Sequence, residues 1–136
     1  MHAQAYFVYD SKKSGGLTQS HLRFGDSPIR QPYLVTGADF VACHNPAYVA
    51  KYDMVRDLKA GGLFLLNCGW SPAELGERLP AAIRRGLADK QARFYTIDAI
   101  ATARELGLGG RQNTAPPTPF FPPTGLDAPR PAARAR

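Results

Sequence analysis

A cluster of cationic, hydroxyl and glycine residues near the N-terminus has the composition of an anion-binding loop. This cluster, named the lysine loop below, consists of Ser11, Lys12, Lys13, Ser14, Gly15 and Gly16. Ammonium and hydroxyl groups donate hydrogen bonds to a phosphate or a carboxylate, and glycines let backbone N–H groups approach an anion closely. The same composition is also typical of a solvated turn between two strands. The residue types alone leave both interpretations open.

Two asparagines have the polarity and the position for a hydrogen bond to a ligand. Asn67 ends the apolar run of residues 63–66, and Asn113 follows a glycine-rich stretch at residues 107–110. Asn67 could instead cap its own turn before Ser71, and Asn113 could be an ordinary loop residue. Trp70, next to Asn67, could border a ligand or pack on the following helix.

Other chemically active residues have no spacing that defines a site. The two cysteines, Cys43 and Cys68, lie in separate apolar runs without a CxxC pattern, so we expect them to be reduced and buried. A metal site at Cys43 and His44 with His21 or His2 is an alternative, but its spacing matches no known metal signature. We find no nucleophile with an adjacent base and no paired carboxylates, so no catalytic residue is predicted.

Composition and charge restrict the class of protein. The chain has 136 residues, 44% of them hydrophobic and 21% charged, which is typical of one soluble globular domain. It contains no apolar stretch near the roughly 18 residues that a membrane span requires and no signal-peptide pattern, so we expect a cytoplasmic protein. The net charge of +6 is scattered and accompanies no nucleic-acid recognition motif. We therefore expect neither nucleic acid nor a membrane as partner.

Five segments have the pattern of β-strands. Residues 4–10 are predicted to form a buried strand, and residues 18–24 a second extended piece. Residues 38–43, 62–68 and 93–97 are mostly apolar, as in strands covered on both faces.

Helices are predicted between these strands. Asn45 and Pro46 begin one in which Tyr48, Tyr52, Val55 and Leu58 form an apolar stripe, and which ends at Gly61 and Gly62. Ser71, Pro72 and Glu74 form a capping-box signature for the next helix, with a kink or restart expected at Pro80. Residues 99–106 form the last helix.

Strands and helices therefore alternate from residue 38 to residue 110, which predicts an α/β domain with a mostly parallel sheet. Ligands of such sheets bind beyond the carboxyl ends of the strands. In this chain those ends are residues 10–13, 43–45, 67–70 and Asp98. Residues 115–136 contain seven of the twelve prolines and have no apolar period, so we expect a disordered Pro/Ala/Arg-rich tail.

Six stretches, in one unbroken order, resemble the γ domain of pyruvate:ferredoxin (flavodoxin) oxidoreductase, of the 2-oxoacid:ferredoxin oxidoreductase family. They are YFVYDSKKSGG, SHLRFG with the following PIR, ADFVACHNPA, KYDM, GGLFLLNCGWSPAEL and LGLGGRQNT. The resemblance covers roughly residues 4–114 and implies a domain over residues 1–114 with a Rossmann-like, three-layer α/β fold.

The resemblance implies a role within a larger enzyme. Members of the family oxidatively decarboxylate pyruvate with thiamine diphosphate, pass electrons through iron–sulfur clusters to ferredoxin or flavodoxin, and form acetyl-coenzyme A. The γ domain is associated with coenzyme A, which makes Lys12, Lys13, Asn67 and Asn113 candidates for contacting it. Thiamine diphosphate and the clusters belong to other domains, and those domains are the implied partners of this chain.

The chain also departs from the family pattern. The γ domain of the family begins earlier, with a G-S-D-G-T-type phosphate loop, and continues into further helix after the GGRxNT stretch. We therefore expect a fragment that is inactive alone and marginally stable or prone to aggregation. Alternative interpretations are a stand-alone module that binds a small molecule or nucleotide, and a non-catalytic remnant that docks onto other domains.

Overall fold

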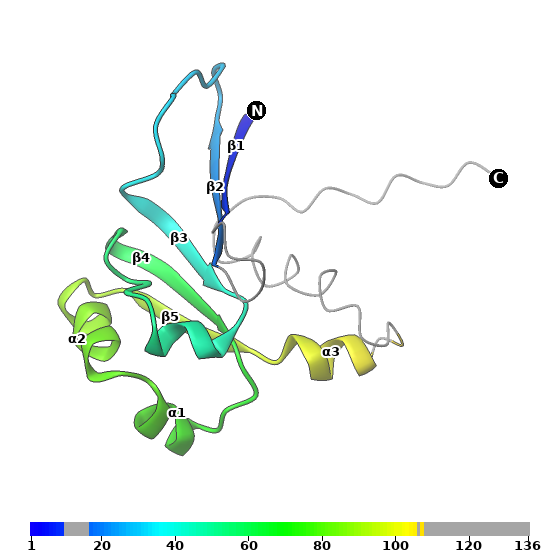
Figure 1. Ribbon diagram of the computed structural model, residues 1–136, viewed down its shortest axis with the longest axis vertical. Coiled ribbons are helices and arrows are strands. Elements are labelled where there is room, and N and C mark those ends of the chain that lie inside the picture. Colours follow the sequence, from blue (N-terminus) through cyan, green and yellow to red (C-terminus); the bar gives the residue numbers. More distant parts are fainter. Residues whose placement is uncertain (10–16, 106, 108–136) are drawn as a thin grey trace. The chain divides into compact units, whose positions relative to one another are not determined.

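The computed structural model describes residues 1–9, 17–105 and 107. These residues form two compact units, which divide between Gly37 and Ala38. The first unit holds an antiparallel pair of strands, and the second holds a three-stranded parallel sheet with its helices (Figure 1).

The first unit is a β-hairpin followed by residues 26–37, named the return segment below. Strand β1 (His2–Tyr9) pairs along its whole length with β2 (Thr18–Gly25), from His2 opposite Gly25 to Tyr9 opposite Thr18. The prediction of strands in both segments is confirmed. The predicted burial of this strand is wrong for residues 4–9, because Phe7 and Tyr9 keep 54% and 70% of their surface exposed. Residue 10 lies outside the described residues. An antiparallel pair leaves each face open unless another segment covers it, and β1 is not a strand of the parallel sheet.

The second unit has the predicted α/β architecture. Strands β3 (Ala38–Cys43), β4 (Leu58–Asn67) and β5 (Arg93–Ile97) form a parallel sheet in the order β3-β4-β5. A short 3-10 helix, η1 (Pro46–Ala50), connects β3 to β4, and α1 (Pro72–Arg78) with α2 (Ala81–Asp89) connects β4 to β5. Helix α3 (Ala99–Glu105) follows β5.

The core lies between one face of the sheet and the connections η1, α1 and α2. Phe64 and Leu66 of β4 are fully buried there, together with Val49 of η1 and Ile83 of α2. Phe94 of β5 stacks on Phe64 with ring centroids 5.7 Å apart. Strand β5 is less buried than predicted, because it lies at the edge of the sheet and exposes 46% of Tyr95.

The long helix predicted to begin at Pro46 is wrong. Asn45 does cap a helical segment, with its Oδ1 accepting from the Ala47 N–H at 3.0 Å, but η1 ends at Ala50. Gly61 and Gly62 lie inside β4 instead of ending a helix. Gly61 has a φ of +71°, and a Cβ on Gly62 would lie 2.7 Å from Leu58. The two glycines thus permit the irregularity in β4 where its register with β3 shifts.

The capping predictions for the later helices are confirmed. Ser71 and Glu74 form the reciprocal capping box of α1, and the hydrogen bond from Ser71 lowers the pKa of the Glu74 carboxyl. Pro80 separates α1 from α2, as expected for a residue that interrupts helical hydrogen bonding. In the described part of the chain, helices are too short or too polar to cross a membrane.

Candidate functional site at the carboxyl edge of the parallel sheet

The parallel register brings the three strand ends of the second unit to one edge. Cys43 of β3 pairs with Leu66, and Asn67 pairs with Ile97 of β5. His44, Asn67 and Asp98 are therefore neighbours, as the sequence predicted for the ends of parallel strands. This edge is the candidate site that the described residues provide.

Asn67 connects the segments that follow the two outer strands, β3 and β5. Its Nδ2 donates to the carbonyl oxygen of His44 at 3.0 Å, and its Oδ1 accepts from the N–H of Ala99 at 3.0 Å. The side chain thus connects the end of β3 with the first residue of α3 rather than capping its own turn. An amide group has a second N–H and further lone-pair capacity, so contact between Asn67 and a ligand stays a prediction.

Asp98 and Gly69 are in close contact at the same edge. Asp98 Oδ1 accepts from the N–H groups of Ile100 at 3.1 Å and Ala101 at 2.9 Å, which caps α3. A Cβ placed on Gly69 would lie 2.6 Å from Asp98 Oδ2. A side chain at position 69 would therefore have to displace the carboxylate that caps α3.

The cysteine at this edge is a structural residue. The Cys43 thiol donates to the carbonyl oxygen of Asn45 at 3.1 Å, and burial raises the pKa of the Cys43 thiol to about 11. A thiol that stays protonated at neutral pH is a poor nucleophile and a poor metal ligand. Both cysteines are free and buried, as predicted. Within residues 1–9, 17–105 and 107, His, Cys, Asp and Glu form no group of three that could hold a metal ion.

Trp70 packs on the helix that follows it, which confirms one of its two predicted roles. The guanidinium of Arg78 in α1 lies 5.6 Å from the centre of the Trp70 ring, within the range of a cation–π interaction. Arg78 also pairs with Glu74 at 3.0 Å. The indole thereby connects the strand end at residue 67 with the C-terminal turn of α1.

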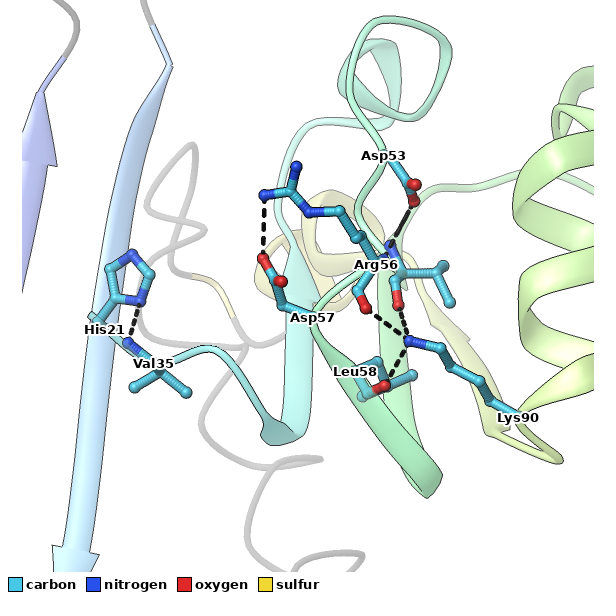
Figure 2. A network of polar contacts seen from close by, with 8 residues as sticks. His21, Val35, Asp53, Arg56, Asp57, Leu58 and Lys90 are labelled. Carbon is cyan, nitrogen blue, oxygen red and sulfur yellow. Dashed lines mark hydrogen bonds and ion pairs between the residues drawn. The ribbon is translucent and has the colours of Figure 1, made fainter. Parts of the chain in front are cut away.

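The opposite side of the second unit contains a polar network that local sequence patterns did not reveal (Figure 2). The ammonium of Lys90 donates to the carbonyl oxygens of Val55 at 2.7 Å, Arg56 at 2.6 Å and Leu58 at 2.6 Å. Asp53 Oδ1 accepts from the N–H groups of Val55 at 3.2 Å and Arg56 at 3.1 Å. The network fixes residues 53–58 as a turn, which explains why the predicted helix does not continue there.

The remaining candidates fall in two groups. The lysine loop from Ser11 to Gly16 and Asn113 lie outside the described residues. His21, named above as an alternative metal ligand, is in β2 of the first unit, where its Nδ1 accepts from the Val35 N–H at 3.2 Å. Arg23 of the same strand lies 5.0 Å from the Tyr33 ring centre. Both side chains thus hold the return segment on the hairpin.

At the described edge, the polar side chains stabilise the backbone of the chain itself. Its amide, carboxylate and thiol groups bind to backbone groups of the same chain, at Asn67, Asp98 and Cys43. Such an edge can present a rigid surface to a ligand or to another domain.

Comparisons with known proteins relate the chain to one family. The family model described as pyruvate ferredoxin/flavodoxin oxidoreductase matches residues 1–118. The pyruvate-flavodoxin oxidoreductase of Klebsiella pneumoniae is 54% identical over 133 residues, which are 98% of this chain and 11% of the relative. The pyruvate:ferredoxin oxidoreductase of Moorella thermoacetica is 55% identical over 121 residues, 89% of this chain and 10% of the relative.

A relative with a different printed activity also matches. The pyruvate dehydrogenase [NADP(+)] of Cryptosporidium parvum is 46% identical over 127 residues, 93% of this chain and 7% of the relative. The chain thus spans about a tenth or less of the length of these curated relatives.

Proposed function

The chain belongs to the pyruvate ferredoxin/flavodoxin oxidoreductase family, and we propose that it acts as one part of an enzyme that oxidatively decarboxylates pyruvate to acetyl-coenzyme A. Electrons from this reaction pass to ferredoxin or flavodoxin. The observation that carries the proposal is the match of nearly the whole chain, at 54% identity, to a segment of a pyruvate-flavodoxin oxidoreductase. The chain by itself is inactive in this proposal.

The iron–sulfur clusters of such an enzyme do not fit the residues of this chain. A cluster requires about four cysteine thiolates, whereas this chain has two cysteines. Both are buried, and the raised pKa of Cys43, about 11, keeps that thiol protonated. We propose that other parts of the enzyme hold the clusters and thiamine diphosphate.

Within the enzyme, the proposed contribution of residues 1–114 is binding of coenzyme A together with domain packing. The lysine loop supplies two cations and four small or hydroxyl residues for a phosphate of coenzyme A, and Asn67 and Asn113 supply amides. The ordered strand ends at Asn67 and Asp98 support this proposal, because a binding edge gains from rigidity. A cytoplasmic location is also proposed, since unpaired cysteines are typical of a reducing compartment.

The binding role can be tested in a chimera in which this chain replaces the matching 133 residues of the Klebsiella pneumoniae relative. The variant Lys12→Ala/Lys13→Ala should raise the KM for coenzyme A roughly tenfold, equivalent to about 1.4 kcal/mol, without changing the KM for pyruvate. Lys51→Ala/Lys59→Ala removes the same charge elsewhere and is the control. An unchanged KM for coenzyme A in the first variant would exclude the lysine loop as a contact.

Domain packing is the second proposed function, and the exposed side chains of the hairpin support it. The first unit exposes several large apolar side chains, among them Phe7, Leu22 and Phe24. A soluble domain that works alone seldom leaves such side chains together on one face.

A further inference from the structure

One face of the β1–β2 hairpin is uncharged, largely apolar and exposed in the part of the chain that the structure describes. Side chains alternate along a strand, and directly opposite residues point to the same face. The register therefore places eight exposed residues on one face, which we name the aromatic face: Ala3, Ala5, Phe7, Tyr9, Thr18, Ser20, Leu22 and Phe24. None of the eight carries a charge.

The bulky side chains of the aromatic face form one continuous row. Phe24 and Leu22 lie opposite Ala3 and Ala5, so that the large side chains at one end of the hairpin belong to β2. At the other end Phe7 and Tyr9 lie opposite Ser20 and Thr18, so that the large side chains belong to β1. The rings of Phe7 and Tyr9 stack with centroids 6.4 Å apart. A partner surface that is apolar and uncharged gains the most free energy by covering this row.

The opposite face of the hairpin is in contact with the return segment of the same unit. The return segment meets it through the bond from the Val35 N–H to His21 and through the contact between Arg23 and Tyr33. Ile29 of the same segment lies within van der Waals distance of a Cβ placed on Gly25. The return segment thus shields part of this face, where Gln4, His21 and Arg23 are half-buried, while Tyr6 and Val8 of the same face stay 41% and 37% exposed. All eight residues of the aromatic face are exposed, although a two-stranded pair is marginally stable without a second layer.

We propose that the aromatic face docks the first unit onto an apolar surface of the rest of the oxidoreductase polypeptide, and this inference rests on the proposed function. The Klebsiella pneumoniae relative is about nine times as long as the matched segment, which is 11% of its length. A partner surface on the same polypeptide has an effective concentration in the millimolar range. That concentration favours the rest of the enzyme over a second copy of this chain as the occupant.

The test uses the chimera described above and the 136-residue chain. Hydroxyl-radical footprinting should oxidise Phe7 and Tyr9 at least fivefold more slowly in the chimera than in the chain alone. Phe7→Thr/Leu22→Thr should lower the melting temperature of the chimera by several degrees, while Tyr95→Thr/Ile100→Thr, at sites 46% and 47% exposed in the second unit, should lower it less. The same face substitutions should reduce aggregation of the chain alone.

Two results would overturn the proposal. The first is an equal oxidation rate of Phe7 and Tyr9 in the chimera and in the chain alone. The second is a discrete dimer of the 136-residue chain that Phe7→Thr/Leu22→Thr abolishes, because the occupant would then be a second copy. Flavodoxin reduction by the same chimera reads out the proposed function separately, so protection without activity would support docking while counting against the enzyme assignment.

Discussion

The ammonium of Lys90, which follows α2, donates to the carbonyl oxygen of Leu58, the first residue of β4, at 2.6 Å. Two further carbonyl oxygens, of Val55 and Arg56, accept from the same group. This three-point contact joins residues more than 30 positions apart in sequence and closes the turn before the central strand (Figure 2).

Lys90→Met should destabilise the chain by about 2–3 kcal/mol, because hydrogen bonds to a charged group are lost and the carbonyl oxygens are left without their donor. Lys90→Arg should also destabilise it, since a planar guanidinium cannot reproduce a tetrahedral three-point contact. Urea unfolding measures both. Lys51→Met, at an exposed position, is the matched control and should stay within about 0.5 kcal/mol of wild type. Equal effects at positions 90 and 51 would show that the Lys90 contacts contribute nothing.

Asn67→Ala should cost about 2 kcal/mol, since it removes two hydrogen bonds of about 1 kcal/mol each. Asn67→Asp should cost at least as much, because its carboxylate still accepts from the Ala99 N–H but places a charged acceptor opposite the His44 carbonyl oxygen, to which the amide donated. Hydrogen exchange at the Ala99 amide distinguishes the two: exchange should accelerate in Asn67→Ala and stay slower in Asn67→Asp. The same rate in both variants would contradict the bridging role.

Gly69→Ala should destabilise the chain by about 1–2 kcal/mol, because the new methyl group displaces the capping carboxylate of Asp98. Combining it with Asp98→Ser, a shorter cap, should cost less than the sum of the two single changes. Gly76→Ala is the control: it lies in α1 with no atom within 4 Å of the added Cβ, and should stabilise by about 0.5–1 kcal/mol. Additive effects of the changes at positions 69 and 98 would refute the contact.

The raised pKa of the Cys43 thiol should make the free energy of unfolding depend on pH. Its pKa rises from 9.0 to about 11 in the folded chain, so the folded state holds the proton that the unfolded state releases first. The associated stability is complete below pH 9 and is lost as the pH rises toward 11, at up to about 1.4 kcal/mol per pH unit.

Urea unfolding at pH 8, 9 and 10 should show a steeper loss for wild type than for Cys43→Ala. Val49→Ala deletes buried apolar volume without removing a thiol and should run parallel to wild type. Identical slopes for wild type and Cys43→Ala would disprove the raised pKa.

Local signals predicted much of the fold. The apolar runs predict strands β3 and β4 correctly, and local sequence also predicts the capping box at Ser71 and the break at Pro80. Each of these features depends on neighbouring residues alone. The stripe of Tyr48, Tyr52, Val55 and Leu58 predicts a helix that does not form. Tyr48, Val55 and Leu58 pack on the core from a 3-10 helix, a loop and a strand. Helical spacing alone cannot distinguish that arrangement from a helix.

Long-range contacts account for what the sequence did not predict. The partners of Asn67 lie 23 and 32 positions away, and those of Lys90 lie 32 to 35 positions away. No periodicity encodes such pairs. Likewise, the composition of β1 predicted a strand but not that its aromatic residues would be exposed, because burial depends on what covers the strand.

We propose that this chain serves as a working part of a pyruvate oxidoreductase and has no such activity alone. The most direct measurement is pyruvate- and coenzyme A-dependent reduction of flavodoxin by the chimera that carries this chain in the Klebsiella pneumoniae relative. We expect a rate within roughly tenfold of the parent enzyme, which is a barrier difference of at most about 1.4 kcal/mol, and no reduction by the 136-residue chain. A chimera that folds and holds its cofactors but shows no pyruvate-dependent reduction would contradict it.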